Sequence, residues 1–181
     1  SSGSDVTIIV DILSFSTCID VALSRGAIVY PYPYKDETAI EFANSLGAIL
    51  ASFKRSRDNI SLSPLSLINI KADTRIVLPS PNGSELSLHS PSKVTLCACL
   101  RNYKAVAEYA NSISSNIAVI PAGEKWQNGT IRFAIEDYLG AGAVLSELKG
   151  NLSMEAETAS GLYKTFEPIL KNIIIGESKK L

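Results

Sequence analysis

Four acidic side chains, Asp11, Glu124, Glu136 and Asp137, are candidate metal ligands. Asp11 ends a short apolar, β-branched run, and Glu124 follows another such run. Carboxylates are hard oxygen ligands of the kind that Mg²⁺ prefers. Glu136 and Asp137 are adjacent, so on a helix they point about 100° apart and at most one is expected to face the same site. These residues indicate a site for a divalent cation, although Asp11 could instead cap the helix that follows it.

Groups suited to phosphate occur at the ends of other apolar runs. Arg101 and Arg132 can each donate two parallel N–H groups to phosphate oxygens. The turn at residues 82–84 can direct backbone N–H groups at an anion because glycine accepts unusual dihedrals, although an Asn-Gly pair is more often only a tight turn. Arg101 and Asn102 could equally be an ordinary helix start. The combination predicts phosphoryl chemistry, and the candidate residues are Ser80, Asn82, Gly83, Ser84, Arg101, Asn102 and Arg132.

Apolar β-branched runs alternate with amphipathic stretches, which predicts an α/β fold. We expect a three-layer α/β/α sandwich with a mixed or mostly parallel sheet, as a single domain over residues 1–181. In such sheets, ligands bind beyond the carboxyl ends of the strands, where the polar residues above would meet. Strands are expected at residues 6–12, 27–32, 74–78, 94–98, 117–120 and 169–175, helices from 16 or 17 to 24 and at 37–46, 102–112, 131–148 and 153–166, a turn at 79–84, and a polar loop with a short helix at 52–69.

The composition narrows the classes of partner. The chain has 181 residues with 17 basic and 18 acidic side chains, a net charge of −1, so no basic surface is expected for nucleic acid. No apolar run approaches the ~20 residues that span a bilayer, so no membrane partner is expected. Three cysteines, at 18, 97 and 99, match no metal spacing and indicate free thiols in a reducing cytoplasm.

Several well-known catalytic motifs are absent from the sequence. It contains no G-x-x-x-x-G-K-[ST] phosphate loop and no G-x-S-x-G nucleophile elbow. The single histidine, His89, excludes a histidine-pair phosphatase and a histidine-rich zinc site.

Five blocks occur in an order that resembles the 2-phosphosulfolactate phosphatase (ComB-like) family. They are VDILSFST at 10–17, LPSPNGS at 78–84, CLRN at 99–102, IPAGE at 120–124 and EDYLGAGA at 136–143. The resemblance implies an Mg²⁺-dependent phosphatase with a three-layer fold that converts 2-phospho-3-sulfolactate to sulfolactate and phosphate, a step of coenzyme M biosynthesis in methanogens. It implies Asp11, Arg101 and Glu124 as catalytic residues, Ser80, Asn82, Gly83, Ser84, Asn102, Lys125 and Arg132 as substrate-binding residues, and Asp11, Glu124, Glu136 and Asp137 around the metal.

Departures from the family pattern concern the substrate. Many members have Arg-Ala where this chain has Ser14 and Phe15, which removes a cation for a sulfonate or carboxylate. Lys125 stands where Arg is common. A related phosphorylated hydroxy acid is therefore an alternative substrate. Relatives carry a further C-terminal segment, which we expect to be missing here.

Three nucleophiles are compatible with the sequence: a metal-bound water molecule first, Asp11 second and Cys99 third. Two alternatives to an enzyme remain, a non-catalytic anion-binding module and a protein-interaction domain. A homo-oligomer is possible on either interpretation.

Overall fold

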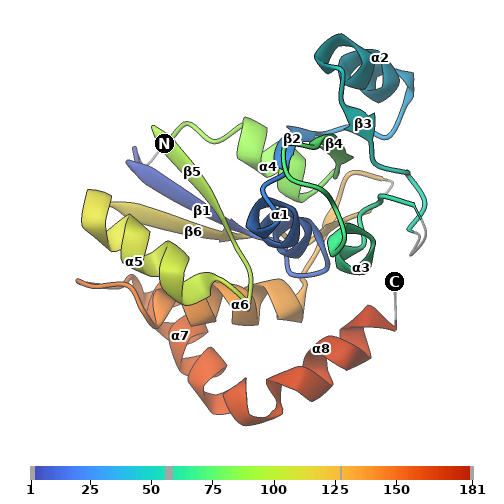
Figure 1. The fold of residues 1–181 in the computed structure, drawn as a ribbon. Coiled ribbons are helices and arrows are strands. Elements are labelled where there is room, and N and C mark those ends of the chain that lie inside the picture. Colours follow the sequence, from blue (N-terminus) through green and yellow to red (C-terminus); the bar gives the residue numbers. More distant parts are fainter. Residues whose placement is uncertain (1–2, 56–58, 127, 180–181) are drawn as a thin grey trace.

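A computed structural model describes residues 3–55, 59–126 and 128–179, in which helices alternate with parallel strands (Figure 1). One sheet has the order β5-β1-β6, from β1 (Val6–Val10), β5 (Val94–Ala98) and β6 (Ile117–Pro121). All pairs are parallel, and Val6 lies opposite both Val94 and Ile117. β1 is the central strand and is buried throughout, as its unbroken apolar sequence predicts.

A second parallel sheet has the order β2-β4-β3, from β2 (Ile28–Tyr32), β4 (Arg75–Pro79) and β3 (Ile49–Leu50). β7 (Glu124–Lys125) and β8 (Ile131–Arg132) form a short antiparallel hairpin after β6. The chain passes from the first sheet to the second through α1 (Phe15–Ser24) and returns through α4 (Gly83–Leu88). The segments that follow β1 and β4 can therefore meet between the two sheets.

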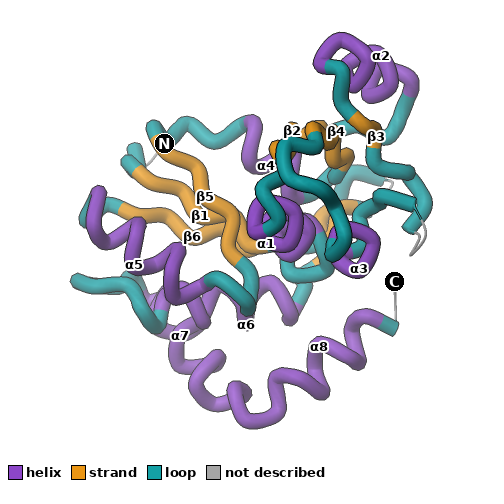
Figure 2. Tube along the Cα trace, in the orientation of Figure 1, coloured by secondary structure: helices purple, strands orange, loops and turns teal. Residues whose placement is uncertain are grey.

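The helices cover both sheets (Figures 1 and 2). α5 (Tyr103–Ile113) and α6 (Ile135–Leu145) pack on the first sheet, and α7 (Met154–Phe166) packs on α6. The chain continues through η1 (Glu167–Ile169) into α8 (Leu170–Ser178). α2 (Glu37–Leu46) packs on β3 and β4, and α3 (Pro64–Leu67) packs on α1.

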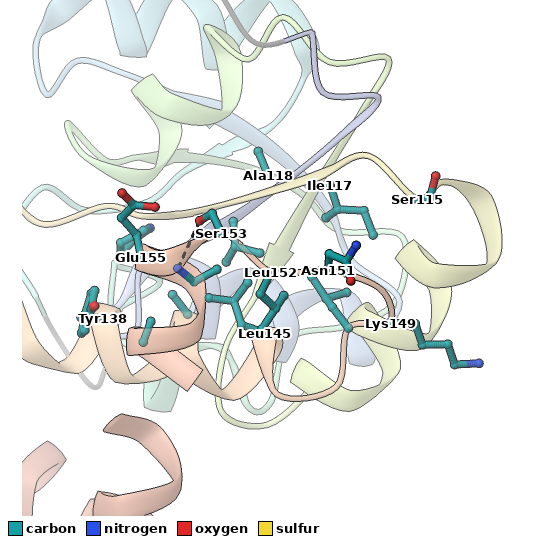
Figure 3. A pocket seen from close by; sticks show the side chains of 16 residues that line it. Ser115, Ile117, Ala118, Tyr138, Leu145, Lys149, Asn151, Leu152, Ser153 and Glu155 are labelled. Carbon is teal, nitrogen blue, oxygen red and sulfur yellow. Dashed lines mark hydrogen bonds between the residues drawn. The ribbon is translucent and has the colours of Figure 1, made fainter. Parts of the chain in front are cut away.

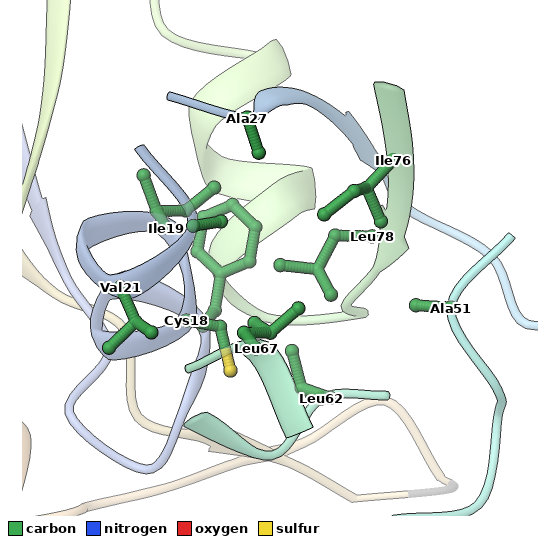
Figure 4. Close-up of a cluster of buried hydrophobic side chains, with 11 residues drawn as sticks. Cys18, Ile19, Val21, Ala27, Ala51, Leu62, Leu67, Ile76 and Leu78 are labelled. Atoms are coloured by element: carbon green, nitrogen blue, oxygen red, sulfur yellow. The ribbon is translucent and has the colours of Figure 1, made fainter. Parts of the chain in front are cut away.

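Two apolar clusters hold these layers together. The first joins β1 to α5 and α6, with Val10 and Val144 fully buried. The second lies around α1, where Cys18 and Ile19 face Leu67 of α3 and Leu78 of β4 (Figure 4). Burial of such side chains contributes most of the favourable free energy of folding.

The predicted α/β class is confirmed, and two helices have the predicted limits. α2 begins after Asp36, whose carboxylate accepts the Thr38 N–H, and ends at Gly47, whose φ of 58° favours glycine. α7 begins after Ser153, whose hydroxyl accepts the Ala156 N–H. In both helices the residue types at the ends are ones that commonly cap helices, so the sequence alone indicates these limits.

Two local expectations were wrong, and two short elements were not expected. Residues 169–175, expected as a strand, lie mostly in α8, because Leu170 and Ile174 recur at helical spacing and Ile174 packs on the core beside α6. The expected helix at 131–148 begins only at Ile135, since residues 131–132 pair with the strand before them. The turn predicted at 79–84 leads at Gly83 into α4, which contacts β1 and β2, and β3 was not expected at all.

A search of the described residues for a helix long and apolar enough to cross a bilayer finds none.

Candidate active site

Asp11 lies at the carboxyl end of β1 and is buried, with 5% of its surface exposed. Its Oδ1 accepts the Phe15 N–H at 3.1 Å, and its Oδ2 accepts the Gly83 N–H at 3.1 Å. Ser14 and not Asp11 is the N-cap residue of α1, but the Asp11 carboxylate accepts the first N–H of that helix and also binds the first residue of α4. These two contacts fix it between the two sheets.

Asp137, in the first turn of α6, is likewise buried and accepts two backbone N–H groups. Its Oδ1 accepts Ile12 N–H at 2.7 Å, and its Oδ2 accepts Gly123 N–H at 3.0 Å. The side chain thus fastens the segments after β1 and β6 to α6. Because both oxygens are used by the backbone, Asp137 acts here as a positioning group for the loops that carry Asp11 and Glu124.

Glu124 and Glu136 complete the acidic set. Glu124 begins the hairpin and is half-buried. Glu136 is buried, and its Oε2 has no hydrogen-bond partner among the described residues. A buried carboxylate oxygen without a donor is costly, so its presence points to a function or a missing ligand.

The negative charges of these carboxylates repel one another. Burial, and then the charge of Glu124, raise the pKa of Asp11 from 3.8 to about 6. Burial, and then the charges of Asp11 and Glu136, raise the pKa of Asp137 from 3.8 to about 8. The backbone donors oppose both shifts without cancelling them. Positive charge bound at this position would relieve the repulsion.

The donor set fits Mg²⁺ in chemistry, but not as a site of four carboxylates. Within residues 3–55, 59–126 and 128–179, no three His, Cys, Asp or Glu side chains converge on one position. Mg²⁺ is usually held by one or two carboxylates, with water and substrate phosphate completing its shell. Asp11 accepts two backbone N–H groups just as Asp137 does, so these hydrogen bonds do not choose between the two. Asp11 and Glu124 are the pair that suits this arrangement, because the charge of Glu124 acts on the pKa of Asp11 and no described hydrogen bond occupies the Glu124 carboxylate.

Of the residues that follow β4, Gly83 contacts Asp11, and the polar contacts of this segment are with the protein itself. Gly83 gives its N–H to Asp11, so that donor is aimed at a side chain of the protein. The Ser84 hydroxyl donates to Leu78 O at 3.1 Å, and Ser80 is buried. Asn82 Oδ1 accepts the Lys125 N–H at 3.1 Å, which joins this segment to the hairpin. Their predicted contacts with substrate stay predictions.

Arg101 and Asn102 follow β5, and their described partners are residues other than the four candidate metal ligands. The Arg101 guanidinium pairs with Asp20 of α1 at 2.7 Å, and its side chain is 60% exposed. Asn102 precedes α5, as predicted, but its side chain accepts Cys99 N–H at 2.7 Å and donates to Cys97 O at 3.3 Å. Among the described residues no hydrogen bond or ion pair joins Arg101 to Asp11, and the catalytic role of Arg101 stays a prediction.

In the hairpin, Arg132 lies opposite Glu124, and Lys125, the next residue after Glu124, lies opposite Ile131. Lys125 Nζ pairs with Glu85 of α4 at 2.8 Å. Arg132 donates from Nη1 to Phe133 O at 3.3 Å. Both are on the segment that carries Glu124, and Lys125 has its charge neutralised by an α4 side chain.

Two cations near Asp11 were missed by the sequence analysis. Arg55 donates from Nη1 to Ser14 Oγ at 2.8 Å, and its charge acts on the pKa of Asp11. Burial, and then the charge of Arg55, lower the pKa of Lys35, whereas the charges of Glu124 and Asp11 raise it. Both residues lie in polar connections that carry no recognisable sequence motif. Only the tertiary structure shows that these cations lie near the acidic residues.

The three cysteines are free thiols. Burial raises the pKa of Cys97 to about 11 and raises the pKa of Cys18 and Cys99 as well. The thiolate is the nucleophilic form, so these shifts disfavour Cys99 as the attacking group.

A separate apolar pocket of about 410 Å³ lies along the exposed edge of β6 (Figure 3). Ile117, Leu145 and Leu152 are among the residues that line it, from β6, α6 and the segment before α7. None of the acidic residues at the strand ends lines it, so it is distinct from the candidate active site.

Comparison with known proteins places this chain in a family. A sequence profile of 2-phosphosulpholactate phosphatase matches residues 1–180. The 2-phosphosulfolactate phosphatase of Methanothermobacter thermautotrophicus is 35% identical over 161 residues, which cover 87% of this chain and 67% of that protein. Proteins named probable 2-phosphosulfolactate phosphatase are similar in Carboxydothermus hydrogenoformans, at 30% identity over 88% of this chain and 66% of the relative, and in Thermotoga maritima, at 31% over 88% and 70%. The chain thus spans about two thirds of the length of these curated relatives. It belongs to the 2-phosphosulpholactate phosphatase family, a family of phosphoric monoester hydrolases.

Proposed function

We propose that this chain hydrolyses 2-phospho-3-sulfolactate, or a related phosphorylated hydroxy acid, to the free acid and inorganic phosphate in an Mg²⁺-dependent reaction. The observation that carries the proposal is the buried Asp11 carboxylate, which accepts the N–H groups of Phe15 and Gly83. The charge of Glu124 raises the pKa of this carboxyl group. It lies where the segments after two parallel strands meet, which is where ligands bind in such folds. Relatives that share this chain's family are named for that reaction.

Asp11 and Glu124 would hold the metal ion. When bound, Mg²⁺ supplies positive charge that neutralises the transferring phosphoryl group. The protein contributes mainly by positioning the reacting groups and by keeping bulk solvent away from them. Asp137 fixes the two loops that carry Asp11 and Glu124, so the spacing between these carboxylates is set before substrate arrives.

A water molecule is the proposed nucleophile, and a carboxylate accepts its proton. An aspartyl-phosphate on Asp11 is the second candidate, and its formation would require one carboxylate oxygen to leave its backbone donor. The stereochemistry at an isotopically chiral phosphorus distinguishes the two, since direct attack by water inverts it and two successive displacements retain it.

The function is tested by phosphate release from 2-phospho-3-sulfolactate with Mg²⁺, compared with other phosphorylated hydroxy acids. We expect turnover by the wild type and a loss of at least about 100-fold in kcat for Asp11→Asn. Glu124→Gln is a second variant, because no described hydrogen bond of its side chain holds the fold together. Ligand binding without phosphate release from any substrate would instead indicate an anion-binding module.

We further infer a cytoplasmic location. The support is the free state of Cys18, Cys97 and Cys99, which a reducing compartment maintains. Cell fractionation with an antibody against the chain tests this inference.

A further inference from the structure

Arg55 reaches from the connection between β3 and α3 to the segment that follows β1. Its Nη1 donates to Ser14 Oγ at 2.8 Å, and its Nη2 donates to Leu13 O at 3.3 Å. Ser14 is buried and immediately precedes α1, two residues beyond the segment that Asp137 holds. The guanidinium is therefore anchored beside the loop of Asp11, although Arg55 and Ser14 are 41 positions apart in sequence.

The anchoring leaves Arg55 able to bind a further acceptor. Among the described residues, its guanidinium donates to these two acceptors, and a guanidinium has more N–H groups than two bonds use. The side chain is exposed, so the remaining N–H groups are accessible from solvent. A planar fork of this kind matches a carboxylate or another oxyanion at two points.

Lys35, in the connection between β2 and α2, brings a second positive charge to the same neighbourhood. Partial burial and the charge of Arg55 lower the pKa of Lys35, whereas the charges of Glu124 and Asp11 oppose that shift. The charges of these two cations and two carboxylates thus affect one another's pKa values, although the four residues come from four different segments of the chain. Both cations come from the second sheet, and both carboxylates follow strands of the first.

Arg55 and Lys35, like Arg132 of the hairpin, have no ion-pair partner among the described residues, in contrast to two other cations around the site. Arg101 is paired with Asp20, and Lys125 is paired with Glu85. Within the described parts of the chain, neither Arg55 nor Lys35 lies within 4.0 Å of a carboxylate. Arg55 is bound to the loop that follows Asp11 and is not neutralised by direct contact with a described carboxylate, which is the arrangement expected of a subsite that receives an anion.

We propose that Arg55, assisted by Lys35, binds the second anionic group of the substrate, a carboxylate or sulfonate on the carbon chain next to the phosphate ester. The proposal rests on the proposed phosphatase function, which already requires the phosphate to lie by Asp11 and Glu124. On this arrangement the first sheet supplies the reacting site, and the second sheet selects substrates that carry an additional negative charge.

The test compares a substrate with the second anion to one without it. We expect Arg55→Gln to lower kcat/KM for 2-phospho-3-sulfolactate by at least about 30-fold, mainly through KM, and to change p-nitrophenyl phosphate hydrolysis by less than about 3-fold. Arg55→Lys is expected to lose less than Arg55→Gln, because it keeps the charge but not the fork. Lys35→Gln is expected to show the same selectivity with a smaller loss. Arg25→Gln, at the far end of α1, is the matched control and should leave both substrates unchanged.

Equal losses on both substrates, or unchanged selectivity in Arg55→Gln and Lys35→Gln, would overturn the proposal. Urea unfolding midpoints equal to that of the wild type would show that the effect is not a loss of folding. If the wild type releases phosphate from no substrate, the proposed function fails, and the subsite is then decided by calorimetry with 3-sulfolactate. Weaker binding by Arg55→Gln supports the subsite in that case, and equal binding rejects it.

Discussion

The carboxylate of Asp11 accepts the backbone N–H of Gly83 at 3.1 Å, across 72 positions of sequence. This hydrogen bond joins the segment after β1 to the start of α4, and therefore joins the two sheets. Phe15 packs at the same place, since a Cβ built on Gly83 would lie 2.2 Å from Phe15 Cδ1. A glycine at position 83 is thus required by the close approach of α1 and not by its dihedral angles.

Replacing Gly83 tests this junction. Gly83→Ala would place a methyl group against the ring of Phe15 and push α4 away from Asp11. We expect the free energy of unfolding to fall by about 1–3 kcal/mol and phosphatase activity to fall by at least about 10-fold. Urea denaturation and phosphate release measure the two effects.

Gly161→Ala in α7 is the control for this substitution, because nothing lies within 4 Å of a Cβ at that position. It should raise the free energy of unfolding by about 0.5–1 kcal/mol, since alanine favours a helix over glycine. A Gly83→Ala protein as stable and active as the Gly161→Ala protein would contradict the close packing described here.

The stability of the protein without divalent metal should fall as the pH rises from about 4 to about 8. The pKa values of Asp11 and Asp137 are raised in the folded state, to about 6 and about 8. The folded state therefore holds more protons than the unfolded chain over this range, so each increase in pH favours unfolding. Urea midpoints at several pH values in the presence of a chelator measure the slope.

Asp137→Asn should reduce that slope, because it removes the group with the larger shift. The variant is expected to be less stable at low pH, since an amide cannot accept from both Ile12 and Gly123 as the carboxyl group does. Asp73→Asn serves as control at an exposed position where asparagine tolerates the positive φ of 61°. The idea is rejected by an Asp137→Asn protein whose stability varies with pH as steeply as that of the wild type.

The cysteines should react slowly in the folded protein. Burial raises the pKa of all three thiols, which keeps the reactive thiolate scarce at neutral pH. We expect a coloured disulfide reagent to modify them at least about 10-fold more slowly than in urea, and Cys99→Ser to keep phosphatase activity within about 3-fold. Loss of activity in Cys99→Ser with an unchanged unfolding midpoint would restore Cys99 as a nucleophile.

Removal of divalent metal should abolish phosphate release, and added Mg²⁺ should restore it. If Asp11 and Glu124 hold the ion, Glu124→Gln should require at least about 10-fold more Mg²⁺ for half-maximal activity, because it loses one charged ligand. Glu41→Gln, on the exposed surface of α2, is the control and should need the same concentration as the wild type. A metal requirement that is equal in Glu124→Gln and Glu41→Gln would exclude Glu124 as a ligand.

The α/β class and much of the element order were predictable because local patterns encode them. The buried run of β1 and the caps of α2 and α7 act over a few residues. The predictions failed where contacts between residues distant in sequence, and not the local sequence pattern, determine the secondary structure. Residues 169–175 are rich in isoleucine and resemble a strand, but the helix they form places Ile174 against the core.

The sequence alone determined which polar residues follow the strands, and the order of the five blocks that the family shares. Only the tertiary structure decided which neighbour each of these side chains takes. It pairs Arg101 with Asp20 and Lys125 with Glu85, and it brings Arg55 to Ser14. The physical reason is that a strand or helix is specified by neighbours along the chain, whereas an ion pair depends on the direction and reach of side chains from segments that only folding brings together.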